Sequence, residues 1–481
     1  MPVGHLKEIL ELLSGLKVES VRFGLRQEMI VEVPGKAVTA FTIACKQQPI
    51  HAVSQKKSFP NIVSSYAGAN IFNGESWVRE GLYKDVFELF DYEPTLKINI
   101  CEQQQTFVPF FTGNINFIAS AHTHYWYVYI RFPKTQTLYC LPELVYTNGL
   151  AVVAKQAEKI MLKEKELYFE NKNANGQIFF EKLKAQISFI GKKMESPLRI
   201  PKFSLPYYEG FNKTGNEYWL GVYRRDEWFS VAFLKDICAV CIETKTAQVY
   251  TTNWKGIIIK NIDASKRNLW DYILGRHRIN VRHAANELNW QVEDHSEEGL
   301  ILKRLIIRHF DKADVRTYGL CFAIETKPAS MFGTVIIRKA DRKNPGRLKS
   351  LERFDILYTK DFNPNNAKEI VLFRKDVMKE HIGTYLVSLC KLFYDEESRE
   401  DILQQLTQQT MINSNVIITG KKIVYRCKDC FTVYDEETGD VANNILPGTP
   451  FNALDDNYCC PLCEASKDNF IEVDADELQM G

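Results

Sequence analysis

Apolar residues recur first at helical and then at alternating spacing in two segments of this chain, and the two segments match. Residues 6–33 read LKEILELLSGLKVESVRFGLRQEMIVEV, and residues 234–261 read LKDICAVCIETKTAQVYTTNWKGIIIKN, without a gap at an offset of 228 residues. Each pattern predicts an amphipathic helix, then a strand, a polar corner and a second apolar strand. A unit that is used twice predicts two related half-bodies.

The remaining pattern fits an α+β protein. Residues 106–133 alternate apolar and polar positions and are rich in aromatic residues, which indicates a buried sheet. Further expectations are a helix at 150–167, a loop at 171–176, a proline-rich bridge at 196–210, an exposed basic hairpin at 338–353, and helices at 368–372, 385–393 and 401–409. We therefore predict two pseudo-symmetric mixed half-bodies, residues 1–200 and 201–420, followed by a small metal-bound domain, residues 421–475.

Two CxxC motifs give the strongest chemical signal. Cys427 with Cys430, and Cys460 with Cys463, are separated by 29 residues. Each motif presents two thiolates to one point, and four thiolates form a tetrahedral site that suits iron or zinc. Because a segment of this length buries little apolar surface, the metal is expected to contribute part of the folding free energy.

The segment 425–470 closely resembles rubredoxin, the one-iron electron carrier. Beyond the four cysteines, the matches are Tyr434-Asp435, the Gly439-Asp440 turn, residues 447–451 (PGTPF), Lys467 and Phe470. The resemblance implies one iron ion held by Cys427, Cys430, Cys460 and Cys463, and electron transfer to or from a redox partner protein. Recombinant protein can carry zinc instead, because an S₄ site hardly discriminates between the two metals.

This segment also departs from the family pattern. Phe431 and Glu464 stand where rubredoxins usually have glycine, and Tyr458 replaces the usual tryptophan. Cys459 is an extra thiol, which we interpret as a bystander. An alternative interpretation of the segment is a zinc ribbon that only stabilises the tail.

The corners of the two repeats carry a second, remote resemblance, over residues 1–390. Residues 20–27 (SVRFGLRQ) and 250–256 (YTTNWKG) resemble the corners of sulfite and nitrite reductases, and residues 94–100 (PTLKINI) resemble the basic strand that follows. Those reductases hold sirohaem and substrate between two pseudo-symmetric halves. The resemblance implies a cationic pocket for a small oxyanion or tetrapyrrole carboxylates, with candidate anion-binding residues Arg22, Arg26, Lys97 and Lys255; a solvated basic face is the alternative.

The cysteines that those reductases use are absent here. The family holds a [4Fe–4S] cluster through C-x₅-C and C-x₃-C motifs, and the cysteines before residue 421 have neither spacing: Cys45, Cys101, Cys140, Cys238, Cys241, Cys321 and Cys390. Because four thiolates are needed to hold such a cluster, we expect no [4Fe–4S] cluster in this body, and sirohaem is not expected either.

Three other groups of residues are candidate sites. His122 and His124 would share one strand face and could ligate a metal, although hydrogen-bonded core histidines are the plainer interpretation. Cys238 and Cys241 form a CxxC motif but align with Leu10 and Leu13, which indicates buried apolar positions. Residues 276–283 (RHRINVRH) form a cationic cluster.

Charge and cysteine usage narrow the function classes. Residues 421–481 carry five basic and thirteen acidic residues, a net charge of −8, while the other 420 residues carry +9. This contrast predicts that the tail docks electrostatically on the body.

Basic residues are dispersed along the sequence, so no nucleic-acid partner is expected. No apolar run is long enough for a membrane span. Twelve cysteines without a disulfide pattern predict a cytoplasmic location.

Our leading hypothesis is an electron-transfer protein rather than an enzyme. It combines a one-iron rubredoxin module with a divergent, cluster-less reductase-like body and serves nitrite or sulfite reduction. One alternative is an enzyme whose body keeps a tetrapyrrole or oxyanion site and receives electrons from the tail. The other is a non-catalytic interaction protein with a structural zinc tail.

Overall fold

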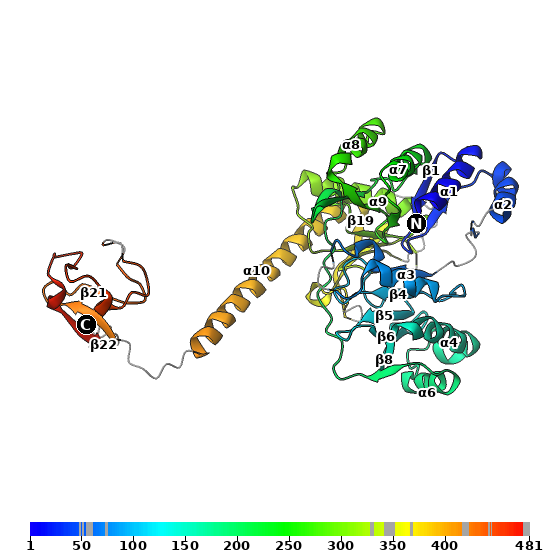
Figure 1. Ribbon diagram of the computed structural model, residues 1–481. Helices are drawn as coiled ribbons and strands as arrows, with labels where there is room; N and C mark the ends of the chain where they lie inside the picture. Colours follow the sequence, from blue (N-terminus) through cyan, green and yellow to red (C-terminus); the bar gives the residue numbers. More distant parts are fainter. Residues whose placement is uncertain are drawn as a thin grey trace. The chain divides into compact units, whose positions relative to one another are not determined.

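The chain forms two compact units, Met1–Tyr394 and Asp395–Gly481 (Figure 1). This computed structural model describes residues 1–47, 50, 52–53, 61–72, 76–327, 331–340, 352–365, 369–415, 423–440, 443 and 445–474, and for residues 400–415 it describes the main chain alone. Within these residues, every helix is too short or too polar to span a lipid bilayer.

The repeat seen in the sequence is confirmed in the local structure. Helix α1 (Val3–Gly15) and helix α7 (Val231–Glu243) have bounds that differ by 228 residues, the offset of the two segments. The strands and second helices follow in the same order: β1 (Ser20–Phe23), β2 (Met29–Val31) and α2 (Val38–Gln47) in the first copy, and β13 (Val249–Thr251), β14 (Ile257–Asp263) and α8 (Arg267–Arg276) in the second. Both copies therefore fold as helix, strand, strand, helix.

Backbone pairing between the two copies is reciprocal. Pro2 bridges Gln248, and Ser20 of β1 pairs with Ser230 of the short strand β12 (Phe229–Ser230). The two pairs are equivalent under the offset of 228 residues, because Pro2 corresponds to Ser230 and Ser20 corresponds to Gln248. Because residue i of one copy meets residue j of the other and the reverse, the two copies are related locally by an approximate two-fold axis.

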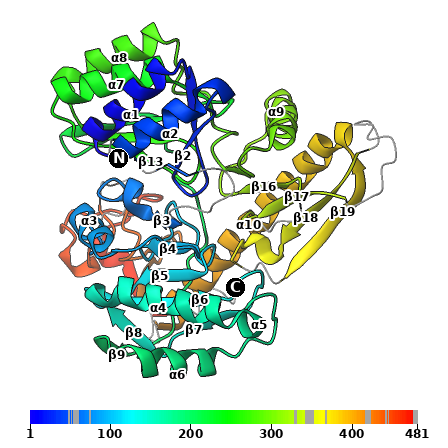
Figure 2. The same ribbon diagram turned by 90° about the vertical axis from the view of Figure 1, so that its right-hand side faces the viewer.

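The amphipathic helices pack their apolar faces against each other. Leu6, Leu10 and Leu13 of α1 are buried in the same cluster as Leu234 and Cys238 of α7. In Figure 2, α1, α2, α7 and α8 lie together at the top of the view. Since fully burying one leucine side chain contributes about 1.5–3 kcal/mol, this shared cluster joins the two copies into one layer.

The first large sheet follows the first copy. Its strand order is β3-β4-β5-β6-β8-β9, with β7 paired to β6 outside this path. The strands are β3 (Ile62–Ser64), β4 (Ile98–Cys101), β5 (Ile115–Ala119), β6 (Tyr125–Arg131), β7 (Leu138–Cys140), β8 (Glu143–Tyr146) and β9 (Gly191–Lys193). β3, β4 and β5 are parallel, and the later pairs are antiparallel. The buried sheet predicted at 106–133 is confirmed by β5 and β6.

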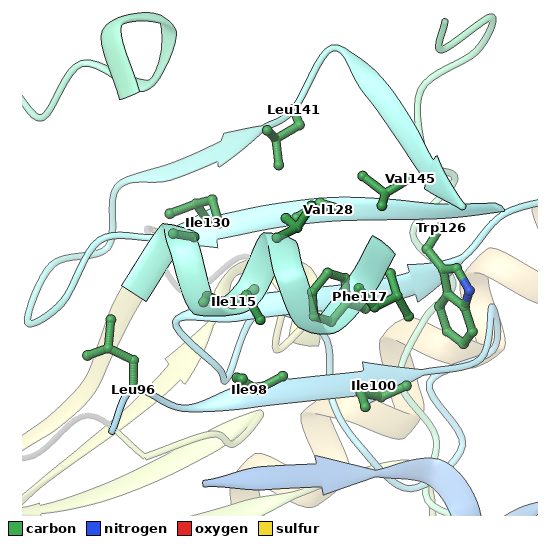
Figure 3. Packing of buried hydrophobic residues seen from close by; sticks show 14 of the residues in the cluster. Leu96, Ile98, Ile100, Ile115, Phe117, Trp126, Val128, Ile130, Leu141 and Val145 are labelled. Atoms are coloured by element: carbon green, nitrogen blue, oxygen red, sulfur yellow. The ribbon is translucent and has the colours of Figure 1, made fainter. Parts of the chain in front are cut away.

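Helices cover this sheet. They are α3 (Glu80–Glu88), α4 (Leu150–Lys163), α5 (Lys165–Tyr168) and α6 (Gly176–Gln186). Figure 3 shows side chains of β4, β5 and β6 gathered on the sheet face that a helix covers, and Leu150 and Val153 of α4 belong to the same cluster. Helix α6 begins after Asn175, whose side chain accepts a hydrogen bond from the Ile178 amide at 3.1 Å, so the predicted loop ends in a helix cap.

The second large sheet follows the second copy. The segment that leads to the second copy includes β10 (Gly210–Thr214) and β11 (Glu217–Val222), which pair with each other, and β11 pairs with β14. The sheet itself has the order β15-β16-β17-β18-β19, formed by β15 (Trp290–Val292), β16 (Phe322–Glu325), β17 (Val335–Lys339), β18 (Arg353–Thr359) and β19 (Ile370–Met378). β15, β16 and β17 are parallel, and β18 and β19 are antiparallel.

The two sheets share one topology. Helix α9 (Glu297–Lys312) stands between β15 and β16 as α3 stands between β3 and β4. Three parallel strands followed by antiparallel strands therefore occur after each copy. The structural repeat extends beyond the two segments in which the sequence shows it.

One helix prediction near residue 380 was wrong, and two were confirmed as parts of a single helix. The segment predicted to start a helix at 368–372 belongs instead, from Ile370, to β19, where Leu372 pairs with Leu357 of β18. Ile370, Val371 and Leu372 form an apolar run that suits a strand. The separate helices predicted at 385–393 and 401–409 are one helix, α10 (Ile382–Asn415). Most of the hairpin predicted at 338–353 lies outside the described residues.

The C-terminal unit holds a three-stranded sheet with the order β21-β20-β22. Its strands are β20 (Ile423–Cys427), β21 (Val433–Tyr434) and β22 (Phe470–Asp474). The core is small: Tyr434, Phe451, Leu454, Tyr458 and Phe470 are buried beside Cys427 and Cys460. So few buried side chains agree with the expectation that a metal adds to the stability of this unit.

Candidate metal centre and cationic pocket

Two turns of the same geometry carry four of the five cysteines of the C-terminal unit. In the first turn, the amide of Phe431 donates to the carbonyl of Cys427 at 3.0 Å; in the second, the amide of Glu464 donates to the carbonyl of Cys460 at 2.9 Å. Phe431 has φ 63° and Glu464 has φ 59°. Both residues therefore adopt the left-handed conformation that glycine usually supplies. Each turn folds its two cysteine side chains toward the same side.

The four sulfur atoms converge on one point. All four Sγ atoms lie within 4.8 Å of one another. Cys427 Sγ is 3.6 Å from Cys463 Sγ, and Cys430 Sγ is 3.4 Å from Cys460 Sγ. A tetrahedral site with metal–sulfur bonds of about 2.3 Å has sulfur–sulfur distances of about 3.8 Å. These separations fit such a site and are far too long for a disulfide.

The centre is open on one side. Cys427 and Cys460 are buried, Cys430 is half-buried and Cys463 is exposed. The pKa of Cys430 is lowered to about 6, chiefly by a hydrogen bond with the hydroxyl of Thr432, and its Sγ lies 3.1 Å from that Oγ1. Because metals bind thiolates rather than thiols, this environment favours ligation. An exposed ligand gives an electron a short path to the surface.

Aromatic side chains support the two turns. The rings of Tyr425 and Phe451 stack with centroids 4.0 Å apart. Tyr434 donates its hydroxyl to the carbonyl of Thr449 at 2.8 Å, and Tyr458 donates to a carboxylate oxygen of Asp440 at 2.9 Å. Tyr458, which replaces the tryptophan of the family pattern, thus keeps a buried polar contact. Cys459 is exposed and lies outside the four-sulfur group.

The N-terminal unit places the four candidate anion-binding residues in two kinds of surroundings. Arg22 lies over the Trp228 ring at 3.7 Å, with Nη2 3.9 Å from Glu297 Oε2. Lys255 Nζ lies 2.8 Å from Glu227 Oε2 and 3.2 Å from Asp294 Oδ1. Burial lowers the pKa of Lys255, and these two carboxylates raise it by more.

Arg26 and Lys97 line one pocket of about 380 Å³, with Arg131 from the end of β6. Arg26 donates through Nη1 to Asn99 Oδ1 at 2.8 Å and through Nη2 to the carbonyl of Ile98 at 2.8 Å. Burial, followed by Arg26 and Arg131, lowers the pKa of Lys97. Arg131 was not singled out in the sequence, where it is only the last residue of an aromatic strand.

Segments from both halves of the repeat form the pocket walls. Arg26 belongs to the first corner and Asn253 to the second, and other lining residues come from before β5, from β15 and from the segment before β17. Phe110, Phe111, Phe332 and Asn365 line the pocket as well. A pocket built from segments this far apart gives no local sequence pattern.

The other sequence candidates do not form a site in the described residues. His122 and His124 lie in the turn between β5 and β6 rather than on a strand face. Cys238 and Cys241 are fully buried on α7, like Leu10 and Leu13 on α1, which confirms them as apolar core positions. In the cationic cluster, Arg276 and His277 contact Asp236 at 3.1 and 2.7 Å, and His283 contacts Glu209 at 3.0 Å.

Comparison with known proteins matches each unit separately. The family model described as Rubredoxin matches residues 424–470. The protein described as "Probable rubredoxin HupJ" of Rhodobacter capsulatus is 48% identical over 48 residues, and "Probable rubredoxin HupI" of Bradyrhizobium diazoefficiens is 45% identical over 49 residues. These matches cover 10% of this chain in each case, and 17% and 71% of the two relatives.

The body resembles a solved structure. The NirA protein of Mycobacterium tuberculosis superposes with a TM-score of 0.56 at 13% identity, and the match covers 80% of this chain and 77% of that one. At this identity the likeness shows a shared fold. It agrees with the fold class predicted from the repeats.

Proposed function

Since this chain belongs to the rubredoxin family through residues 424–470, we propose that its C-terminal unit is a one-iron electron carrier. Cys427, Cys430, Cys460 and Cys463 hold the ion through their thiolates. The observation that carries this proposal is the convergence of four sulfur atoms within 4.8 Å, one of which belongs to the exposed Cys463. A bound iron supplies one-electron redox chemistry at this site, and the protein's own part is to fix the sulfurs and limit water.

The electron carrier is fused to a NirA-like body, and this fusion supports a function in a nitrite- or sulfite-reducing system. The context comes from the corner segments 20–27 and 250–256 together with the shared fold. In this proposal the body is a divergent relative without a [4Fe–4S] cluster, and the redox partner is another protein. The protein acts in the cytoplasm.

The first test is the visible absorption spectrum and metal content of protein purified from its native host. Iron in an S₄ site gives thiolate charge-transfer bands and one iron per chain without acid-labile sulfide. Zinc with no such bands contradicts electron transfer by this unit and favours the structural alternative. Four iron atoms with four sulfides per body contradict the cluster-less interpretation.

A ligand variant tests the assignment of the cysteines. Cys460→Ser removes one of two buried thiolates, so we expect loss of the charge-transfer bands and of most bound iron. Cys459→Ser is the matched control, because that neighbouring thiol lies outside the four-sulfur group. Full iron content in Cys460→Ser, or its loss in Cys459→Ser, contradicts the assignment.

A second candidate function is favoured by the cationic pocket. In that case the body is an enzyme that binds an anionic substrate beside Arg26 and Lys97 and receives electrons from the C-terminal unit. Single-turnover reduction of nitrite or sulfite by the pre-reduced protein tests it. Reoxidation of the iron at the same rate with and without these anions excludes this enzyme activity.

A further inference from the structure

Three cations, Arg26, Lys97 and Arg131, line the pocket of the N-terminal unit, whereas the one carboxylate in its described lining, Glu369, pairs with Lys360 at 2.8 Å. Lys97 and Arg131 both line the pocket, and among the described residues neither has a carboxylate within ion-pair distance. The guanidinium of Arg131 donates to the carbonyl of Thr112 at 3.0 Å. Two unpaired cations beside a third, Arg26, repel one another in a partly enclosed site. An anion in the pocket would relieve this repulsion.

Buried amide groups at the pocket also have unused hydrogen-bonding capacity. Asn253 is 5% exposed, lines the pocket, and its Oδ1 has no hydrogen-bond partner in the described residues. Its Nδ2 donates to the carbonyl of Phe107 at 3.0 Å, which fixes the side-chain orientation. Asn365 Oδ1 and Arg26 Nε are buried without a partner as well. Because leaving a buried polar atom unpaired costs about 1–3 kcal/mol, these atoms point to a ligand with hydrogen-bond donors as well as negative charge.

The size and walls of the pocket describe the rest of the ligand. A volume of about 380 Å³ lies in the range of sites for small organic molecules and exceeds the needs of an inorganic oxyanion. Phe110, Phe111 and Phe332 supply aromatic parts of the pocket wall. Such walls bury a flat apolar group, whereas nitrite or sulfite would leave them in contact with water.

The pocket does not fit the sirohaem and cluster that the reductase resemblance implies. None of the described residues that line it is a cysteine or a histidine, so no side chain of the usual haem-ligand or cluster-ligand types faces the cavity. The buried cysteines nearest in sequence to the lining segments, Cys101 and Cys321, belong to an apolar cluster instead. Burial raises the pKa of both thiols well above the usual value.

We propose that this pocket binds a small organic anion in place of a tetrapyrrole. A phosphate or carboxylate group contacts Lys97 and Arg131, a planar apolar group lies against Phe110 and Phe332, and a donor on the ligand reaches Asn253. This inference goes beyond the electron-carrier function and does not depend on it, because all lining residues belong to the N-terminal unit.

Isothermal titration calorimetry of the full-length protein tests the proposal with three probes: phenyl phosphate, inorganic phosphate and phenol. Phenyl phosphate combines the charge and the flat apolar group, so we expect it to bind about ten-fold or more tightly than either of the others. No binding of phenyl phosphate at millimolar concentration, or equal binding of inorganic phosphate, overturns the proposal.

Variants tie the binding to the named cations. Lys97→Met and Arg131→Met should each weaken phenyl phosphate binding by about ten- to one-hundred-fold, because each removes a charged hydrogen-bond donor. Lys159→Met is the matched control: Lys159 is exposed on α4, outside the pocket lining, and should leave binding unchanged. Unchanged binding in both pocket variants overturns the assignment.

Two further measurements keep the test decisive. Circular dichroism and tryptophan fluorescence show whether the N-terminal unit of each variant is folded, and a variant that fails this check leaves the other to decide. Titration of the purified protein with sirohaem gives the opposing result: a stoichiometric tetrapyrrole complex that Lys97→Met abolishes contradicts the proposal. The spectrum of the C-terminal iron is independent of both outcomes, so failure here is distinguishable from failure of the proposed function.

Discussion

Phe431 and Glu464 are the two residues at which this chain departs most clearly from the rubredoxin pattern. Both follow a cysteine turn, and both have left-handed backbone angles, with φ 63° and 59°. A residue with a side chain costs about 1–2 kcal/mol in this conformation. The turn is kept because its amides bond to the carbonyls of Cys427 and Cys460. The side chains are thus tolerated by a geometry that the four thiolates require.

Phe431→Gly is expected to stabilise the iron-loaded C-terminal unit by about 0.5–1 kcal/mol, since relief of strain exceeds the entropy that glycine loses on folding. The measurement is the denaturant midpoint at which the charge-transfer bands disappear. Phe431→Ala is the control, because it removes the ring and its contact with Arg426 but keeps the strain. An equal gain in both variants would show that the ring, rather than the backbone, is unfavourable.

Lys303 is a buried lysine whose protonation makes the folding stability of the protein depend on pH. Its Nζ donates to the Tyr223 hydroxyl at 2.6 Å and lies 3.9 Å from Glu227 Oε1. Burial, only partly offset by Glu227 and Glu287, lowers its pKa to about 8. In the unfolded chain lysine titrates near 10.4. Between these values the unfolded chain binds more protons, so this group makes the protein more stable as pH rises from 8 to 10.

The corresponding prediction compares wild type with Lys303→Met. The rise in unfolding free energy between pH 8 and pH 10 should be about 1–2 kcal/mol smaller in the variant, because the buried group no longer titrates. Urea unfolding of the N-terminal unit at each pH, followed by tryptophan fluorescence, measures it. Lys159→Met on α4 is the exposed control and should leave the pH dependence unchanged. Parallel curves for wild type and Lys303→Met would contradict the low pKa.

At the scale of elements, helices α1 and α7 connect the two copies of the repeat. Cys238 and Cys241 have the same buried places on α7 as Leu10 and Leu13 on α1. Their thiol pKa values are raised by burial, that of Cys238 to about 12. A CxxC motif here therefore packs as apolar side chains and does not form a reactive pair.

Leu10→Ala should lower the unfolding free energy of the N-terminal unit by about 2–5 kcal/mol, because it leaves a cavity between the two helices. Leu167→Ala is the matched control: Leu167 lies on α5 and is 48% exposed, so its loss should cost about 0.5 kcal/mol or less. Urea unfolding gives both values. A cost in Leu10→Ala no larger than in the control would contradict the shared core.

At the scale of the whole molecule, the uneven charge along the sequence predicts how electrons reach the iron. Residues 421–481 carry a net charge of −8, and Cys463 is exposed. A protein that donates electrons to this centre is expected to present basic groups, which steer the encounter. The expectation that the acidic unit docks on the basic body stays a prediction, which small-angle scattering at low and high salt can test.

Reduction of the iron by a basic protein donor should slow as ionic strength rises from 10 to 200 mM, because the screening length falls below about 10 Å near 0.1 M salt. Stopped-flow absorbance of the charge-transfer bands measures the rate. Reduction by an uncharged small molecule is the control and should show no salt dependence. A salt-independent rate with the basic donor would contradict electrostatic steering.

The sequence by itself determined the four-cysteine site and the existence of the repeat. Each pair of cysteines is brought together by a short turn, so the ligand set can be read from local spacing together with the family pattern. The repeat could be recognised because helix and strand periodicities are also local, and they recur at one offset. The strand at 370–378 was misassigned although its apolar residues suit a strand, because a short apolar run also fits a helix.

Only the tertiary structure decided which charged residues can meet a ligand. Arg22, Arg26, Lys97 and Lys255 were equivalent in sequence, yet Lys255 is held by two carboxylates and Arg22 lies over an indole ring beside Glu297. Arg131 joins Arg26 and Lys97 at the pocket from more than a hundred residues beyond Arg26. The carboxylates that pair with Lys255 and Arg22, and the cations that line the pocket together, come from strands and corners that are distant in the sequence. No local sequence pattern therefore shows which of these side chains the fold brings together.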